Sequence, residues 1–159
     1  MNSPLLPRRA ENDYRGHKLA LWLFGLVVFV KLAIGVNSIF NGYSVASSAD
    51  GIPLDTYTPA GAQAFVTQFA LLGLSHVVMG LLCVLVLVRY RTFVPLMFAL
   101  LLLEHLGKRL ILQYLPIART GTPLGVGINI VLLALMVAGL AFSLWSRGDA
   151  TRTAEGRSR

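Results

Sequence analysis

The chain has 159 residues, of which 55% are hydrophobic and 13% charged, and its net charge is +7. A soluble domain is about 25% charged, so this composition excludes a disordered chain and a soluble nucleic-acid-binding module. It indicates a membrane protein of one domain. The single cysteine, Cys83, excludes an intramolecular disulfide.

Residues 1–18 are polar and basic, and the first apolar run covers about 19–40. A cleaved signal peptide is the alternative for this run, because Ala46-Ser47-Ser48-Ala49 looks like a small-residue cleavage site. The run is longer than a signal core of about 7–15 residues, and the site lies too far beyond it. We therefore expect a retained transmembrane helix.

Residues 41–62 contain no Lys or Arg and several Gly and Pro, which predicts a loop. Within it, Thr58 and Pro59 predict the N-cap and the first position of a second helix. The second apolar run extends over about 59–88, which is longer than a hydrocarbon core of about 30 Å requires.

A basic turn at 89–92 leads to a third run over about 93–115, with Pro95 in its first turn and Pro116 at its end. A second loop follows at 116–122, and Thr122-Pro123 repeats the cap-then-proline start. The fourth run covers about 123–146. The basic tail 147–159 has no apolar run, so we expect it to be disordered.

These runs predict an all-α membrane protein, in which residues 19–146 form a four-helix antiparallel transmembrane bundle. Ten Lys and Arg lie in the N-terminal segment, the 89–92 turn and the tail, against one, Arg119, in the two other loops. By the positive-inside rule this places both termini in the cytoplasm. The expected partner is the lipid bilayer, with a membrane-protein partner or a second copy of the chain, and not a nucleic acid.

Ionisable residues inside a span are costly, so they are the informative positions. At about 1.5 Å per residue from the cytoplasmic helix ends, Lys31, His76 and Glu104 all lie roughly 17–18 Å deep. We expect them to share one layer near the middle of the bilayer. A second layer, about 6–8 Å further out, is expected to hold Asn37, Lys108, Arg109 and Asn129. The predicted polar cluster consists of Lys31, His76, Glu104, His105, Lys108, Arg109 and Asn129.

Two interpretations of this cluster stay open. In the first, Glu104 neutralises Lys31 or Lys108 and the cluster fixes the register of the helices. In the second, the surplus of positive charge binds an anionic lipid, a carboxylate ligand or a quinone carbonyl. Glycines one turn either side of His76, at 73 and 80, would let a neighbouring helix approach closely, and the helix that carries Glu104 is one candidate.

Other chemistry has weaker support. His76, His105 and Glu104 are plausible metal ligands, but they lack the spacing of a metal site on one helix, so no metal is expected. No catalytic serine, nucleotide-binding or phosphate-binding motif is present. We therefore do not expect an enzyme, and no cofactor is required by the sequence.

The layout resembles the small four-helix bacterial membrane proteins grouped as DoxX-like. The shared features are the length, the basic turn Arg89-Tyr90-Arg91 after Gly80-Leu81-Leu82, and the polar segment late in the third helix. The resemblance covers residues 19–146 in outline, and no functional residue is carried over. Some members of that group are small subunits in quinone-coupled oxidation, so the resemblance implies an accessory subunit.

The leading hypothesis is a non-enzymatic accessory or interaction subunit that contains a buried polar cluster. The alternative is a small carrier or redox-complex subunit that binds an anionic lipid or quinone between the second and third helices. An ion pair of Glu104 with Lys31 or Lys108 in a dry interior favours the first. A cluster that opens on a cavity of roughly 300 Å³ or more favours the second.

Overall fold

The computed structural model describes residues 12, 14, 16–120 and 124–156, with side chains as far as Trp145, and this part of the chain is mostly helical and contains no strand. Four helices are long: α1 (Lys18–Phe40), α3 (Pro59–Arg89), α4 (Val94–Tyr114) and α5 (Leu124–Gly156). Four short helical segments connect them: α2 (Gly42–Ser44), the π-helix η1 (Val45–Ala49), and the 3₁₀ turns η2 (Leu54–Thr56) and η3 (Arg91–Phe93).

The predicted helix starts follow local chemistry. The Thr58 hydroxyl accepts a hydrogen bond from the Gly61 amide at 3.2 Å, which satisfies one of the free N–H groups of the first turn of α3. Pro95 lies in the first turn of α4, where its missing N–H costs nothing. The predicted Thr122-Pro123 start lies outside the described residues, and so does most of the 1–18 segment.

Two sequence predictions are corrected. The segment expected as a loop from residue 41 contains α2, η1 and η2 before α3 begins at Pro59. The tail expected to be disordered from residue 147 continues α5 to Gly156. Extending an existing helix by one residue is far easier than nucleating one, and this stretch contains Ala, Arg and Glu, which favour a helix. Residues 157–159 lie outside the described part.

Three helices of the described chain are long and apolar enough to cross a membrane: α1, α3 and the part of α5 from Leu124 to Trp145. Helix α4, at 21 residues, is long enough to span a hydrocarbon core of about 30 Å. It differs in composition, because every 18-residue window of α4 contains Glu104, Lys108 and Arg109. The fold is therefore that of a multi-pass membrane protein.

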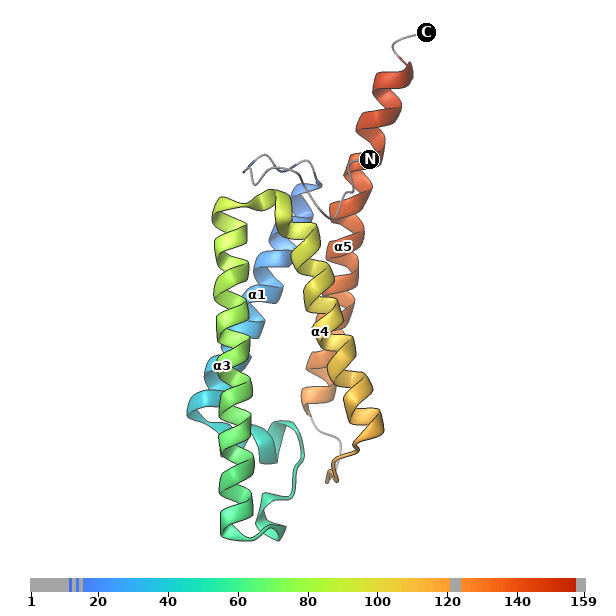
Figure 1. Cartoon of the computed structure of the whole chain (residues 1–159). Helices are drawn as coiled ribbons and strands as arrows, with labels where there is room; N and C mark the ends of the chain where they lie inside the picture. The colour runs from blue at the N-terminus through green and yellow to red at the C-terminus, as the bar shows by residue number, and fades with distance from the viewer. Residues whose placement is uncertain (1–11, 13, 15, 121–123, 157–159) are drawn as a thin grey trace.

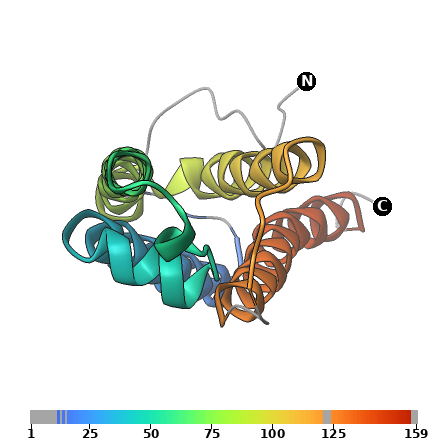
Figure 2. The same ribbon diagram turned by 90° about the horizontal axis from the view of Figure 1, so that it is seen from below.

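The helices pack unevenly around one another. Helix α1 packs along α3 and also contacts α5, and α5 packs against α4. Helices α3 and α4 meet at the η3 turn and diverge away from it (Figure 1), with few contacts between them. Seen along the helices (Figure 2), α3 and α4 lie on one side of the molecule, and α1 and α5 lie on the other.

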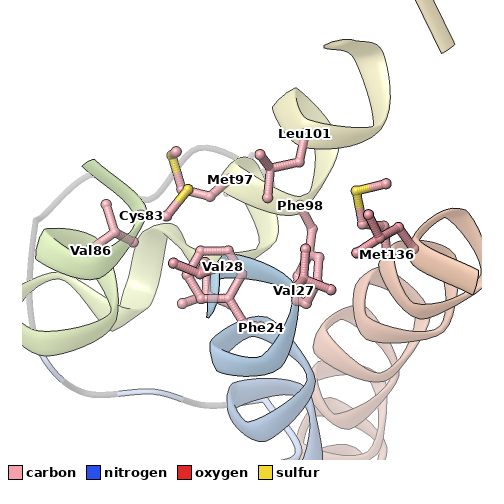
Figure 3. Close-up of a cluster of buried hydrophobic side chains, with 11 residues drawn as sticks. Phe24, Val27, Val28, Cys83, Val86, Met97, Phe98, Leu101 and Met136 are labelled. Carbon is pink, nitrogen blue, oxygen red and sulfur yellow. The ribbon is translucent and has the colours of Figure 1, made fainter. Parts of the chain in front are cut away.

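The main apolar core lies at the end of the molecule where α3 and α4 meet (Figure 3). The rings of Phe24 and Phe98 form its centre, edge to face, with centroids 5.0 Å apart. The other buried members, from all four long helices, are Val27, Val28, Cys83, Val86, Val94, Met97, Leu101, Leu132 and Met136. This core fixes the helix ends on one side of the polar residues.

A second, smaller apolar cluster closes the opposite end. Ala46, Ile52 and Leu54 are buried there, and the segment that carries them folds back over the start of α3. The partly buried side chains that pack on it are Phe65, Val66, Phe69 and Ile117. The middle of the molecule therefore lies between two apolar clusters, and the polar residues are found in that middle layer.

Candidate functional site

Four ionisable side chains from three helices meet directly beyond the main core. Lys31 lies one turn after the core residue Val27 on α1, and Glu104 lies three residues after the core residue Leu101 on α4. Residues three and four apart share a helix face. Lys31 and Glu104 therefore lie on the same faces of α1 and α4 as these core residues, about one turn further along each helix. His76 on α3 and Lys108 on α4 complete the group, which we call the polar cluster.

Glu104 is the centre of the polar cluster. Its Oε2 accepts a hydrogen bond from Lys31 Nζ at 2.5 Å, and its Oε1 accepts one from Lys108 Nζ at 2.5 Å. His76 Nε2 lies 3.3 Å from the same Oε1. One carboxylate therefore joins α1, α3 and α4, and the three residues expected to share a layer are in contact.

The members differ in their access to solvent. The side chain of Lys31 is 8% exposed and that of His76 14%, whereas the side chain of Glu104 is 26% and that of Lys108 36% exposed. The Lys31–Glu104 ion pair is thus the shielded part of the cluster. Lys108 forms its open edge.

Lys108 links the first layer to the second. Its position on α4 is one turn beyond Glu104, and its side chain bonds Glu104, which is one of the two ion pairs that the sequence offered for this acid. The reason is that helical side chains lean towards the helix N-terminus. A lysine is long enough for its Nζ to reach the level of the preceding turn.

Close packing of α1 against α3 brings Lys31 and His76 together. A Cβ atom added to Gly73 would lie 2.7 Å from the backbone oxygen of Gly35, so the two backbones touch there. The helix that uses the glycines around His76 is therefore α1 and not α4, which corrects one candidate from the sequence. Small residues allow a close approach but do not identify the neighbour.

The polar cluster forms one wall of a cavity of about 560 Å³. Its lining comes from α1, η1, α3, α4, the segment after α4, and α5, and Lys31, His76 and Lys108 belong to it. Four other residues singled out from the sequence also line the cavity: Asn37, His105, Arg109 and Asn129. Six of the seven residues of the predicted cluster therefore line the cavity. The seventh, Glu104, bonds Lys31 and Lys108, which line it.

Two charged residues of the cavity were not singled out from the sequence. Asp50, at the end of η1, and Arg119, in the segment after α4, line the wall. Both sit in segments that looked like ordinary loops. They come together because the Thr120 amide donates a hydrogen bond to the Gly51 oxygen at 2.7 Å, which ties the two segments to each other.

Burial raises the pKa of the Asp50 carboxyl above its ordinary value, and the nearby Arg119 guanidinium opposes part of this effect. The lining as a whole is cationic, with Lys31, Lys108, Arg109 and Arg119 against Asp50. Glu104 supplies one further negative charge through its two ion pairs. The cavity therefore has a surplus of two positive charges when these groups are ionised.

The rest of the wall is largely apolar. It includes Ile34 from α1, Leu72 from α3 and Leu112 from α4, with Val126 and Ile128 from α5. A cavity of this size, mostly apolar with a few convergent polar groups, is typical of sites for small molecules. Within the described part of the chain, no group of three His, Cys, Asp or Glu is placed to hold a metal ion.

Comparison with known proteins gives no further constraint, because no family model, no curated protein and no solved structure matches the chain.

Proposed function

We propose that this chain is a small multi-pass membrane protein that binds an anionic amphiphile, a lipid-like molecule with a negatively charged headgroup, in the cavity between α3 and α4. The observation that carries the proposal is the polar cluster's place on the wall of a cavity of about 560 Å³. The Glu104 ion pairs are present, and three members of the polar cluster, Lys31, His76 and Lys108, also line this cavity.

The charge surplus favours an anion over a neutral ligand. Unpaired positive charge is costly in a medium of low polarity, and a bound anion removes that cost. Arg109 is the cation most available to a bound anion, because it lines the cavity, is exposed, and makes no ion pair with the described residues. The apolar lining suits an acyl chain.

Native mass spectrometry with lipid identification, on protein purified in a mild detergent, tests this. We expect the wild type to retain an anionic lipid and Arg109→Gln to lose most of it. Arg89→Gln is the matched control, because Arg89 is an exposed cation at the end of α3 that does not line the cavity. Retention of neutral lipid alone, of a quinone, or of the same anionic lipid by Arg109→Gln would overturn the proposal.

The rival hypothesis is the non-enzymatic accessory subunit, in which the polar cluster only fixes the register of the helices. The DoxX-like resemblance points in the same direction. This hypothesis predicts a purified protein without any retained small molecule and a second protein that copurifies through the lipid-facing helix surfaces. An empty cavity in mass spectra of the wild type would favour it.

The topology that accompanies the proposal has four spans, with α4 as the third, and both termini on the cytoplasmic side of a bacterial inner membrane. It is supported by the Lys and Arg count, with Arg119 the one basic residue of the two non-cytoplasmic loops. In a Cys83→Ala background, a membrane-impermeant maleimide should label Asp55→Cys on intact spheroplasts. It should label Arg91→Cys only after permeabilisation, and the reverse pattern would refute the orientation.

A further inference from the structure

Lys108 connects the polar cluster to the cavity. Its Nζ donates to Glu104 Oε1 and lies 2.5 Å from His76 Nε2. It also lines the cavity, and its side chain is the most exposed of the four. An anion in the cavity would therefore compete with Glu104 and His76 for the same ammonium group.

The contact with Lys108 constrains the hydrogen-bonding role of His76 Nε2 as long as Lys108 is an ammonium group. An ammonium group can only donate hydrogen bonds, so the Nε2 atom beside it must accept, which requires a neutral ring with its proton on Nδ1. His76 Nδ1 is buried and has no hydrogen-bond partner among the described residues. A protonated ring would instead turn an Nε2–H group towards the ammonium, where two donors repel.

We infer that His76 takes up a proton when an anion binds, so that the site binds an anion and a proton together. The inference rests on the proposed anion-binding function and adds its regulation. As the anion draws Lys108 into the cavity, Glu104 Oε1 loses a hydrogen-bond donor. His76 Nε2 is 3.3 Å from that oxygen, and a proton on Nε2 from the surrounding water replaces the lost donor.

The exchange keeps the charge of the buried cluster constant. Before binding, Lys31 and Lys108 oppose Glu104, so two cations face one anion. Afterwards Lys31 and the His76 imidazolium oppose Glu104, while Lys108 is paired with the bound anion. Glu104 therefore keeps two cationic partners, while the ammonium group that it loses is paired with the bound anion.

Few of the other groups around His76 could take up a proton when an anion binds. Arginine keeps its charge across neutral pH, and histidine is the side chain that ordinarily titrates between about pH 5 and 8. His105 is the second histidine on the cavity wall and must be controlled for. The neighbouring groups are Lys31 on α1, Glu104, His105, Lys108 and Arg109 on α4, and Asp50 and Arg119 elsewhere on the cavity wall.

Isothermal titration of the purified protein with decanesulfonate tests the inference, because the charge of a sulfonate does not change with pH. Titrations in buffers of different ionisation enthalpy count the protons taken up, and we expect about one per sulfonate bound. Affinity should also rise by up to about tenfold per pH unit as the pH falls from about 8.5 to about 6. Decanol, which has the same chain without the charge, should show neither effect.

The variant His76→Gln can still accept from Lys108 but cannot take up a proton, so it should bind decanesulfonate with an affinity that no longer depends on pH. His105→Gln is the matched control and should keep the wild-type pH dependence. If His76→Gln does not fold, the proton count on the wild type still decides. Saturable binding without proton uptake, or a pH dependence unchanged in His76→Gln, would overturn the inference and leave the proposed function standing. Absence of saturable sulfonate binding at every pH would overturn both.

Discussion

The shielded Lys31–Glu104 ion pair makes Glu104→Gln the most informative single substitution for stability. The change keeps the shape of the side chain but removes the negative charge that Lys31 Nζ and Lys108 Nζ both bond. Lys31, whose side chain is 8% exposed, would then carry a buried charge without an opposing one. Breaking a buried pair in this way costs about 3–5 kcal/mol, and an exposed pair contributes about 1 kcal/mol or less.

Glu104 is itself 26% exposed on its side chain, so solvent screens part of the interaction. Lys108 is more exposed still, so its ion pair with Glu104 contributes about 1 kcal/mol or less to the stability. We therefore expect a loss of about 2–3 kcal/mol. At about 2–4 °C per kcal/mol for a chain of this length, thermal melting in detergent should show a fall of about 5–10 °C.

A second variant distinguishes an unpaired charge from general disruption. Lys31→Met together with Glu104→Gln removes both partners of the shielded pair, and replacing both members by uncharged side chains is often close to neutral. The double variant should therefore melt closer to the wild type than Glu104→Gln does. Asp55→Asn, at an exposed acidic residue, is the control and should not move the transition. A double variant that is no more stable than Glu104→Gln would refute this reasoning.

Two further predictions concern helix packing and the far end of the cavity. Gly73→Ala should lower stability by about 1–3 kcal/mol, because the added Cβ atom would lie 2.7 Å from the Gly35 oxygen. Gly107→Ala is the control in the same melting assay. It should be neutral or stabilising, because no atom lies within 4 Å of its added Cβ atom. Because burial raises the pKa of Asp50 in the folded protein, its contribution to stability is full below the unfolded pKa and is lost as the pH rises through the folded pKa. Asp50→Asn should therefore melt at or above the temperature of the wild type at neutral pH, and the difference should disappear below about pH 4. A variant that melts at a lower temperature than the wild type at neutral pH would contradict this prediction.

The sequence predicted the long helices and the common depth of three ionisable residues, because both follow from constant geometry. A helix rises by about 1.5 Å per residue, so counting from the basic helix ends placed Lys31, His76 and Glu104 at one level, and the structure brings them into contact. The count follows the Cα atom and places Lys108 one turn beyond Glu104, and the long side chain spans that turn to bond the carboxylate.

Contacts between segments could not be predicted in the same way. Spacing shows that Gly73 permits a close neighbour but not that the neighbour is α1, since this depends on how the helices are arranged around one another. Asp50 and Arg119 belong to different connecting segments, and no periodicity relates such segments. They share a cavity wall because a backbone hydrogen bond from Thr120 to Gly51 joins the two segments.

A purely structural role does not account for the composition of the polar cluster. One lysine and one glutamate are enough to fix the register of two helices, and the shielded Lys31–Glu104 pair already does so. Each further ionisable residue in a span adds a cost on insertion, yet α4 carries Lys108 and Arg109 as well. Both line the cavity; Lys108 shares Glu104 with Lys31, and Arg109 makes no ion pair with the described residues. If register alone mattered, Lys108→Met and Arg109→Leu would leave the molecules that the protein retains unchanged. If the cavity binds an anion, the same two substitutions abolish that binding, because the positive charge that the register does not require is the charge that recognises the ligand.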